Sequence, residues 1–133
     1  MTTWLVALTE EARGVLHGEQ RVIEAFPFKV GRESRGGSGG WAAPERRVGA
    51  ASHLNDLYIA ERGEVHQVSR EHFQIEAQEG RPFVVDRGSA CGTIVEGRVL
   101  GGARQGGRAE VHDHDVIIVG TSASPFVFKV RLG

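Results

Sequence analysis

The sequence predicts an all-β protein with a sandwich or barrel architecture, and three observations support this prediction. The chain of 133 residues contains 19 glycines, and glycine favours tight turns because it adopts left-handed backbone conformations without steric cost. Short apolar runs separated by turn residues recur along the whole chain. Residues 9–13 have a helix-forming composition, but Gly14 follows them directly, so we expect no helix.

The first strands are predicted from short apolar runs. Residues 4–8 form a run that is too short for a helix but suits a buried strand. The run at 18–31 alternates in part and contains Pro27, which indicates an edge position or two consecutive strands. Residues 57–60 predict a further strand.

Two hairpins and a final strand pair complete the predicted sheets. Residues 72–77 and 82–86 form the first hairpin, with turn residues between them. Residues 93–100 form the second, with Glu96-Gly97 at its turn. The last two strands cover 115–120 and 126–132, and the second of these shows clear period-2 alternation. Nine to eleven short strands of this kind are typical of a sandwich or barrel.

Composition limits the class of protein. The length favours a single domain, and a net charge of −1 argues against a dedicated nucleic-acid binder and against a membrane-surface protein. Cys91 is the only cysteine, so no disulfide forms within the chain and a reducing compartment is the simpler interpretation. The N-terminal segment lacks the basic region of a signal peptide. We therefore expect a cytoplasmic protein.

One segment differs from the rest. Residues 34–54 are rich in glycine and show little apolar periodicity, which predicts a long Gly-rich loop insertion. Loops of this length in compact domains are usually functional or disordered.

Three polar stretches lie between the predicted strands. The first stretch, residues 30–34, has Arg32 at a strand end. The second, residues 68–72, contains a hydroxyl, a guanidinium and an imidazole. The third, residues 86–93, is a glycine-rich turn. Arginine offers a planar fork of donors suited to phosphate, and glycine-rich turns present backbone N–H groups to anions. None of the three stretches is specific on its own.

In combination these stretches resemble the forkhead-associated (FHA) domain family, whose pattern is GR, S-x-x-H, S-x-N-G-T and a hairpin ending in N-G. The matching residues are Gly31-Arg32, Ser69 to His72, Ser89 to Thr93 and the Glu96-Gly97 turn. The resemblance extends from about Gln20 to Val130. It implies one FHA domain over 1–133, with the SMAD/FHA-like fold: an eleven-stranded β-sandwich of two antiparallel or mixed sheets.

The resemblance also implies a function. Domains of this family bind phosphothreonine peptides through loops at one end of the sandwich, which would make this chain a non-catalytic signalling adaptor for Ser/Thr-kinase phosphorylation. The expected phosphopeptide-binding residues are Arg32, Ser69, Arg70, Ser89, Ala90 and Cys91, and the expected supports of the site are Gly31, His72 and Gly92. The expected partner is a phosphothreonine-containing protein, with no cofactor, no nucleic acid and no membrane.

The sequence departs from the family pattern at the peptide-reading turn. Cys91 stands where the family has asparagine, and Ala90 stands where a hydroxyl is frequent. A thiol is a weak donor and acceptor, so the loss of one neutral hydrogen-bond pair is expected to cost about 1–2 kcal/mol, roughly tenfold in affinity. A second hypothesis therefore stays open, in which the chain is an FHA-fold scaffold for phospho-independent protein–protein interaction.

A metal-dependent enzyme is the third hypothesis. His112 and His114 alternate with Asp113 and Asp115, and histidines two apart on a strand share one face. The alternative interpretation of 112–115 is a solvated polar turn before a strand. We favour the turn, and we expect no catalytic residues and no metal ligands.

Overall fold

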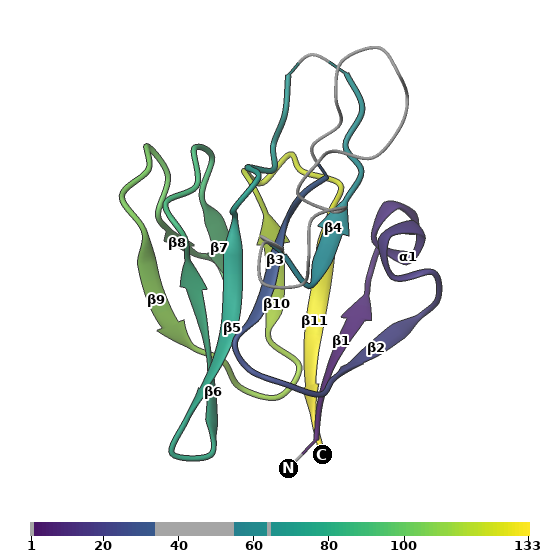
Figure 1. The fold of residues 1–133 in the computed structure, drawn as a ribbon, viewed down its shortest axis with the longest axis vertical. Helices are drawn as coiled ribbons and strands as arrows, with labels where there is room; N and C mark the ends of the chain where they lie inside the picture. The colour runs from purple at the N-terminus through teal and green to yellow at the C-terminus, as the bar shows by residue number, and fades with distance from the viewer. Residues whose placement is uncertain (1, 34–54, 64) are drawn as a thin grey trace, which may run out of the picture.

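The computed structural model describes residues 2–33, 55–63 and 65–133, which form two β-sheets (Figure 1). The strands of the first sheet are β1 (Thr3–Ala7), β2 (Gln20–Ile23), β7 (Thr93–Val95), β8 (Arg98–Leu100), β10 (Val116–Val119) and β11 (Val127–Leu132). The strands of the second sheet are β3 (Phe28–Arg32), β4 (Leu57–Ile59), β5 (Phe73–Gln78), β6 (Arg81–Asp86) and β9 (Gly107–Glu110). The expected loop at 34–54 lies outside the described residues.

The strand order confirms the predicted sandwich of eleven strands. The first sheet has the order β2-β1-β11-β10-β7-β8 and the second has the order β4-β3-β5-β6-β9. The paired strands are antiparallel except β3 and β4, which run parallel. The second sheet is therefore mixed.

The core lies between the two sheets because alternate residues of each strand point inward. In β1 the inward residues are Leu5 and Ala7, and in β11 they are Phe128 and Val130. These side chains join the inward residues of the second sheet in one apolar cluster. Full burial of a side chain such as Phe128 contributes about 1.5–3 kcal/mol.

A helix, α1 (Glu10–Leu16), connects β1 and β2, so the expectation of no helix is wrong. Thr9 caps its first turn, with the hydroxyl oxygen accepting from the Ala12 N–H at 3.1 Å. Ala12 and Leu16 are buried, and His17 ends the helix in a left-handed conformation. Gly14 costs about 1 kcal/mol within the helix, but the cap and the two buried side chains offset this cost. No helix within the described residues is both long and apolar enough to cross a membrane.

β9 is a strand that the sequence did not predict. Its residues, Gly-Arg-Ala-Glu, show no apolar alternation, and the strand forms because its backbone pairs with β6. The hairpin turn expected at Glu96-Gly97 is confirmed, since β7 pairs with β8 across it and both residues have positive φ.

The chain termini and the polar stretches lie at opposite ends of the sandwich. Thr2 and Gly133 exchange two backbone hydrogen bonds, at 2.8 and 3.0 Å, at one end. β3 ends at the other end, and the chain enters β5 there (Figure 1). The polar stretches singled out in the sequence thus meet away from the chain termini.

Candidate functional site

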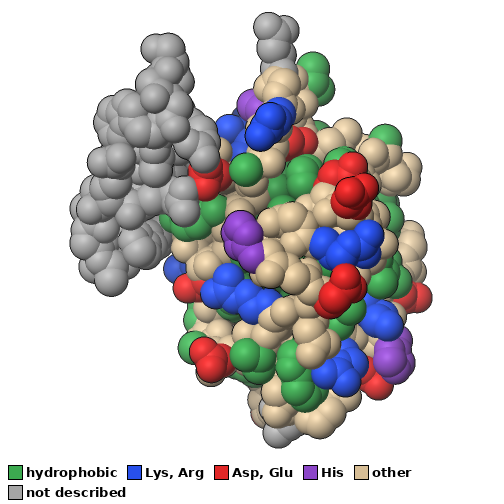
Figure 2. Space-filling view, turned by 90° about the vertical axis from the view of Figure 1, so that its right-hand side faces the viewer, with side chains coloured by type: hydrophobic (Ala, Val, Ile, Leu, Met, Phe, Trp, Pro, Cys, Tyr) green, Lys and Arg blue, Asp and Glu red, His purple; other side chains and the backbone are tan. Residues whose placement is uncertain are grey.

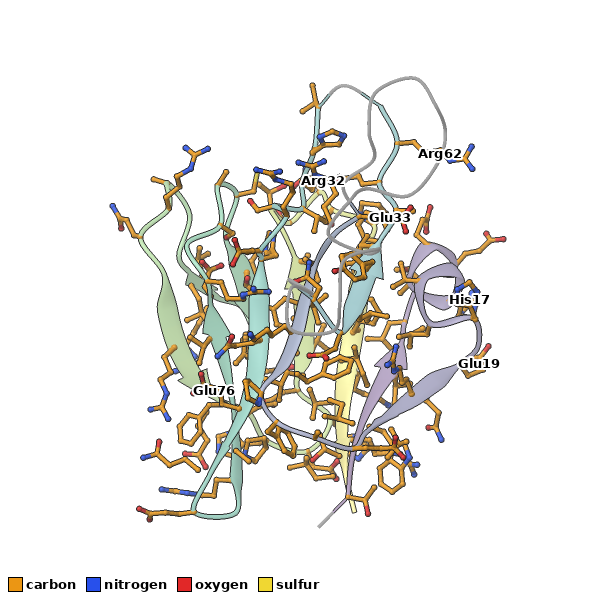
Figure 3. All side chains as sticks on the ribbon, viewed as in Figure 1. His17, Glu19, Arg32, Glu33, Arg62 and Glu76 are labelled. Carbon is orange, nitrogen blue, oxygen red and sulfur yellow. The ribbon has the colours of Figure 1, made fainter. Side chains whose placement is uncertain are left out.

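Arg32 is the last residue of β3 and lies among the loops opposite the termini (Figure 3). Its backbone N–H donates to the Ser69 carbonyl at 2.8 Å, and its side-chain Nε donates to the Val68 carbonyl at 2.9 Å. These two bonds fix the direction of the guanidinium. Its Nη1 and Nη2 groups have no hydrogen-bond partner among the residues that the structure describes, so four N–H donors are left for a ligand.

Ser69 is joined to this arginine through the backbone, and a neighbouring loop bonds its hydroxyl. Its oxygen accepts from the Ala90 N–H at 3.0 Å. A hydroxyl that accepts in this way keeps its own hydrogen to donate. Arg32 and Ser69, which lie 37 positions apart in the sequence, therefore each keep N–H or O–H donors that these hydrogen bonds do not use.

His72 holds the loop that carries Ser69. Its ring is fully buried, Nδ1 accepts from the Ser69 N–H at 2.9 Å, and Nε2 lies 2.7 Å from the Gly92 carbonyl oxygen. An imidazole that accepts at Nδ1 and faces a carbonyl at Nε2 is neutral with its proton on Nε2. Burial lowers the pKa of His72, against the opposing effects of the Gly92 carbonyl and of the Asp86 and Glu61 carboxylates.

Gly31 lets β3 pack directly against the same loop. A Cβ atom at this position would lie 2.0 Å from the Arg70 carbonyl oxygen and 2.7 Å from Nδ2 of Asn55. No side chain fits there without moving backbone. The Gly-Arg pair thus combines close backbone approach at the first residue with a guanidinium at the second that is held through its Nε alone among the described residues.

The turn from β6 to β7 is organised by the buried carboxylate of Asp86. Its Oδ1 accepts from the N–H groups of Gly88 and Ser89 at 2.9 and 2.8 Å. Its Oδ2 accepts from the hydroxyls of Ser89 and Thr93 at 2.6 and 2.8 Å. The Gly92 N–H in turn donates to the Ser89 hydroxyl at 2.9 Å, and Gly92 has a φ of +90°.

This network corrects the expectation for Ser89. Its side chain has 0% exposed surface, and its hydroxyl is already bonded to Asp86 and Gly92. Ser89 therefore builds the turn from inside and does not face a ligand. Asp86 plays the central part in the turn, although the sequence analysis did not single it out.

The other expected peptide-facing residues lie around Arg32 and Ser69. Arg70 and Ala90 are exposed, and Cys91 is half-buried with its Sγ 3.7 Å from the His66 carbonyl oxygen. Ala90 joins the site through the bond of its N–H to Ser69. Its carbonyl also accepts from the Ala103 N–H at 3.0 Å, which anchors the turn to the loop after β8.

A second support of the loop, built on Asn55, was missed in the sequence. Asn55 is 4% exposed, and its Nδ2 donates to the Arg70 carbonyl at 2.7 Å. Its Oδ1 accepts from Nη1 of Arg87 at 2.6 Å, and Nη2 of Arg87 donates to Glu71 at 3.0 Å. The two polar residues Asn55 and Asp56, placed before the short apolar strand β4, were the one available signal for this network.

A cleft of about 690 Å³ lies apart from these residues, between α1 and β4. Its lining includes Leu16, Tyr58 and Phe126 together with the charged residues Glu33 and Arg62. Figure 2 shows the side of the molecule that lies on the right of Figure 1, and on it acidic, basic and apolar side chains alternate over short distances. The lining of the cleft likewise mixes carboxylates with guanidinium groups, so the cleft offers no field of one sign.

Residues 112–115 form a turn between β9 and β10. The Asp115 carboxylate accepts from the His112 N–H at 2.8 Å, and His114 has a φ of 72°. The two histidines thus do not lie on a strand, as chelation across one face would require. Within the described part of the chain no group of three or more His, Cys, Asp or Glu side chains could hold a metal ion.

Comparisons with known proteins point to one family. The family model of the FHA domain matches residues 46–120. No curated protein matches the sequence. Solved structures resemble the fold over nearly its whole length, at identities that support similarity of fold alone.

Three of these structures illustrate the similarity. The FHA domain of the CT664 protein from Chlamydia trachomatis is 18% identical with a TM-score of 0.64, covering 100% of this chain and 99% of that one. The N-terminal FHA domain of Rad53p from S. cerevisiae, solved with a phosphothreonine peptide, is 14% identical with a TM-score of 0.64, covering 100% and 94%. The kinase-interacting FHA domain of the kinase associated protein phosphatase of Arabidopsis is 23% identical with a TM-score of 0.62, covering 98% and 92%.

Proposed function

Because the chain belongs to the FHA domain family, we propose that it binds phosphothreonine-containing proteins and acts as a non-catalytic adaptor that reads phosphorylation by Ser/Thr kinases. The proposal takes 1–133 as one such domain, with 34–54 inserted in it. The Rad53p domain, which has a similar fold, was solved with a phosphothreonine peptide.

The observation that carries the proposal is the arrangement of Arg32. Its Nε is bound to the carbonyl of Val68, the residue before Ser69, and its Nη1 and Nη2 groups have no hydrogen-bond partner among the described residues. A phosphate dianion accepts hydrogen bonds from a guanidinium fork and a hydroxyl together. The exposed Arg70 follows Ser69 and supplies a second positive charge.

The roles of the proposed residues follow from their positions. Arg32, Ser69 and Arg70 bind the phosphate, while the peptide passes Ala90 and Cys91. Gly31, His72 and Gly92 support the loops, and Ser89 belongs with these supports.

The test uses peptide pools centred on phosphothreonine, phosphoserine or unmodified threonine, followed by titration of the best phosphothreonine peptide. Arg32→Ala removes a charge-assisted contact of about 1.5–3 kcal/mol, so the dissociation constant should rise roughly ten- to one-hundred-fold. Arg81→Ala is the matched control, because Arg81 begins β6 at the hairpin far from the site and is equally positive. If the Arg32 variant binds as tightly as the wild type, the assigned site is wrong.

Cys91 favours a second candidate function, that of a phospho-independent scaffold. The thiol stands where the family carries an asparagine, and it lies against the His66 carbonyl. It cannot make the paired hydrogen bonds of a carboxamide with a peptide backbone. Phosphatase treatment of a bound partner separates the two functions, since only a phosphate-dependent complex dissociates.

A further inference from the structure

The loop that carries Ser69 also supplies the two carbonyl groups that hold Arg32. The Val68 carbonyl accepts from Nε of Arg32 at 2.9 Å, and the Ser69 carbonyl accepts from its backbone N–H at 2.8 Å. The guanidinium therefore keeps its direction only if the backbone of residues 67–69 keeps its place. The groups that fix this backbone decide how well Arg32 is oriented.

Every backbone N–H group in this stretch has a side-chain acceptor. The Ser69 N–H donates to Nδ1 of His72, which lies just before β5. The N–H groups of Gln67 and Val68 donate to the two carboxylate oxygens of Glu61, at 2.6 and 2.9 Å. Because Glu61 follows β4, its carboxylate ties the chain that leaves β4 to the chain that enters β5.

The two hydrogen bonds to Glu61 are of a strong kind. A hydrogen bond to a charged acceptor is about twice as strong as a bond between neutral groups, and both oxygens of this carboxylate are used. Val68 is buried, so without Glu61 its N–H group would lose its acceptor where water barely reaches. The position of Val68, and with it the carbonyl that holds Arg32, therefore depends on this carboxylate.

The charge of Glu61 alone would act in the opposite direction. A single residue, Val68, connects the carboxylate to Arg32 through hydrogen bonds, and a carboxylate this near the site repels a phosphate dianion. If repulsion were its only effect, removing the carboxylate would tighten phosphopeptide binding. If the carboxylate holds the carbonyl that orients Arg32, removing it weakens binding. The two effects differ in sign, so one measurement separates them.

We infer that Glu61 is a positioning residue for the phosphate-binding site: its carboxylate fixes the backbone of Val68, whose carbonyl directs the Arg32 guanidinium. Glu61 thereby orders the site before a ligand arrives, which lowers the cost of binding. The effect on peptide affinity rests on the proposed function, whereas the effect on the Arg32 side chain does not.

Two substitutions at Glu61 grade the loss. Glu61→Ala removes both acceptor oxygens, and Glu61→Gln removes the charge but keeps one acceptor oxygen. Glu96→Gln is the matched control, because the Glu96 carboxylate also accepts from a backbone N–H, that of Val116 at 2.7 Å. Glu96 lies in the turn between β7 and β8, outside the hydrogen bonds that hold Arg32.

Titration of the best phosphothreonine peptide gives the first result. The dissociation constant should rise about tenfold for Glu61→Ala, rise less for Glu61→Gln, and stay within about twofold for Glu96→Gln. In an Arg32→Lys background, Glu61→Ala should change the affinity little, because lysine lacks the Nε–H group that the Val68 carbonyl accepts from. A general loss of folding would instead weaken binding in both backgrounds.

NMR of the peptide-free protein gives the second result. The Arg32 Nε–H signal is assigned by its loss in Arg32→Lys. This hydrogen should exchange slowly with water in the wild type, because it is bonded to the Val68 carbonyl, and about tenfold faster in Glu61→Ala. Circular dichroism melting of each variant checks that the fold is retained at the temperature of measurement.

Two results would overturn the inference. Unchanged or tighter peptide binding by Glu61→Ala would mean that only the charge of Glu61 reaches the site. Equal exchange of the Arg32 Nε–H group in Glu61→Ala and the wild type would mean that Val68 keeps its place without the carboxylate. If the wild type binds no phosphothreonine peptide, the proposed function fails, and the exchange measurement alone decides the role of Glu61.

Discussion

Replacing Gly31 by alanine should damage the site through a single methyl group. The new Cβ would lie 2.0 Å from the Arg70 carbonyl oxygen, and ordinary van der Waals contact begins at 3.4 Å, so the loop or β3 must move by about 1.4 Å. Backbone shifts forced by overpacking cost about 1–3 kcal/mol. Since the displaced loop carries Ser69 and Arg70, we expect both lower stability and weaker phosphopeptide binding.

Urea unfolding of Gly31→Ala, with phosphothreonine peptide titration, measures the two effects. Gly14→Ala is the matched control, because nothing lies within 4 Å of its Cβ and alanine favours a helix by about 1 kcal/mol. The first variant should therefore lose stability while the second gains it. A Gly31 variant as stable as the wild type, with unchanged peptide affinity, would refute the close approach of β3 to the loop.

Three further predictions concern single side chains. Burial depresses the pKa of His72, so the stability that its neutral ring provides is complete above the unfolded pKa of about 6.5 and declines as the pH falls below that value. Denaturant unfolding at several pH values should show this decline in the free energy of unfolding, and His72→Gln should make the decline smaller. Cys91→Asn should tighten phosphothreonine peptide binding about tenfold in calorimetric titration, and an unchanged affinity would exclude the missing carboxamide as a limiting contact. Asp86→Ala should lower the unfolding free energy by about 3 kcal/mol or more, because the four N–H and O–H groups that donate to this carboxylate lose their acceptor. A smaller loss in urea unfolding would mean that water replaces the carboxylate.

The strands that could be predicted are those whose own residues carry the signal. β11 alternates along its length, and the Glu96-Gly97 turn supplies the backbone conformations that a two-residue hairpin needs. β9 has no such signal because its partner β6 determines it. For α1, Gly14 led us to expect no helix, whereas in the structure the Thr9 cap and the buried face stabilise one.

Part of the candidate site could likewise be predicted from the sequence, and part could not. Arg32 and Ser69 could be brought together from the motif, and the structure joins their backbones by a hydrogen bond. The network of Asn55, Arg87 and Glu71 joins residues up to 32 positions apart, and no local pattern reports such a contact. Ser89 is buried with its hydroxyl bonded to the Asp86 carboxylate, and this contact exists only once the turn has folded.

The pairing of Thr2 with Gly133 has a practical use. Both ends of the backbone lie at the end of the sandwich opposite Arg32 (Figures 1 and 3). Grafting this domain into a surface loop of a carrier protein, or joining its ends and reopening it elsewhere, should therefore leave the end that carries Arg32 unobstructed.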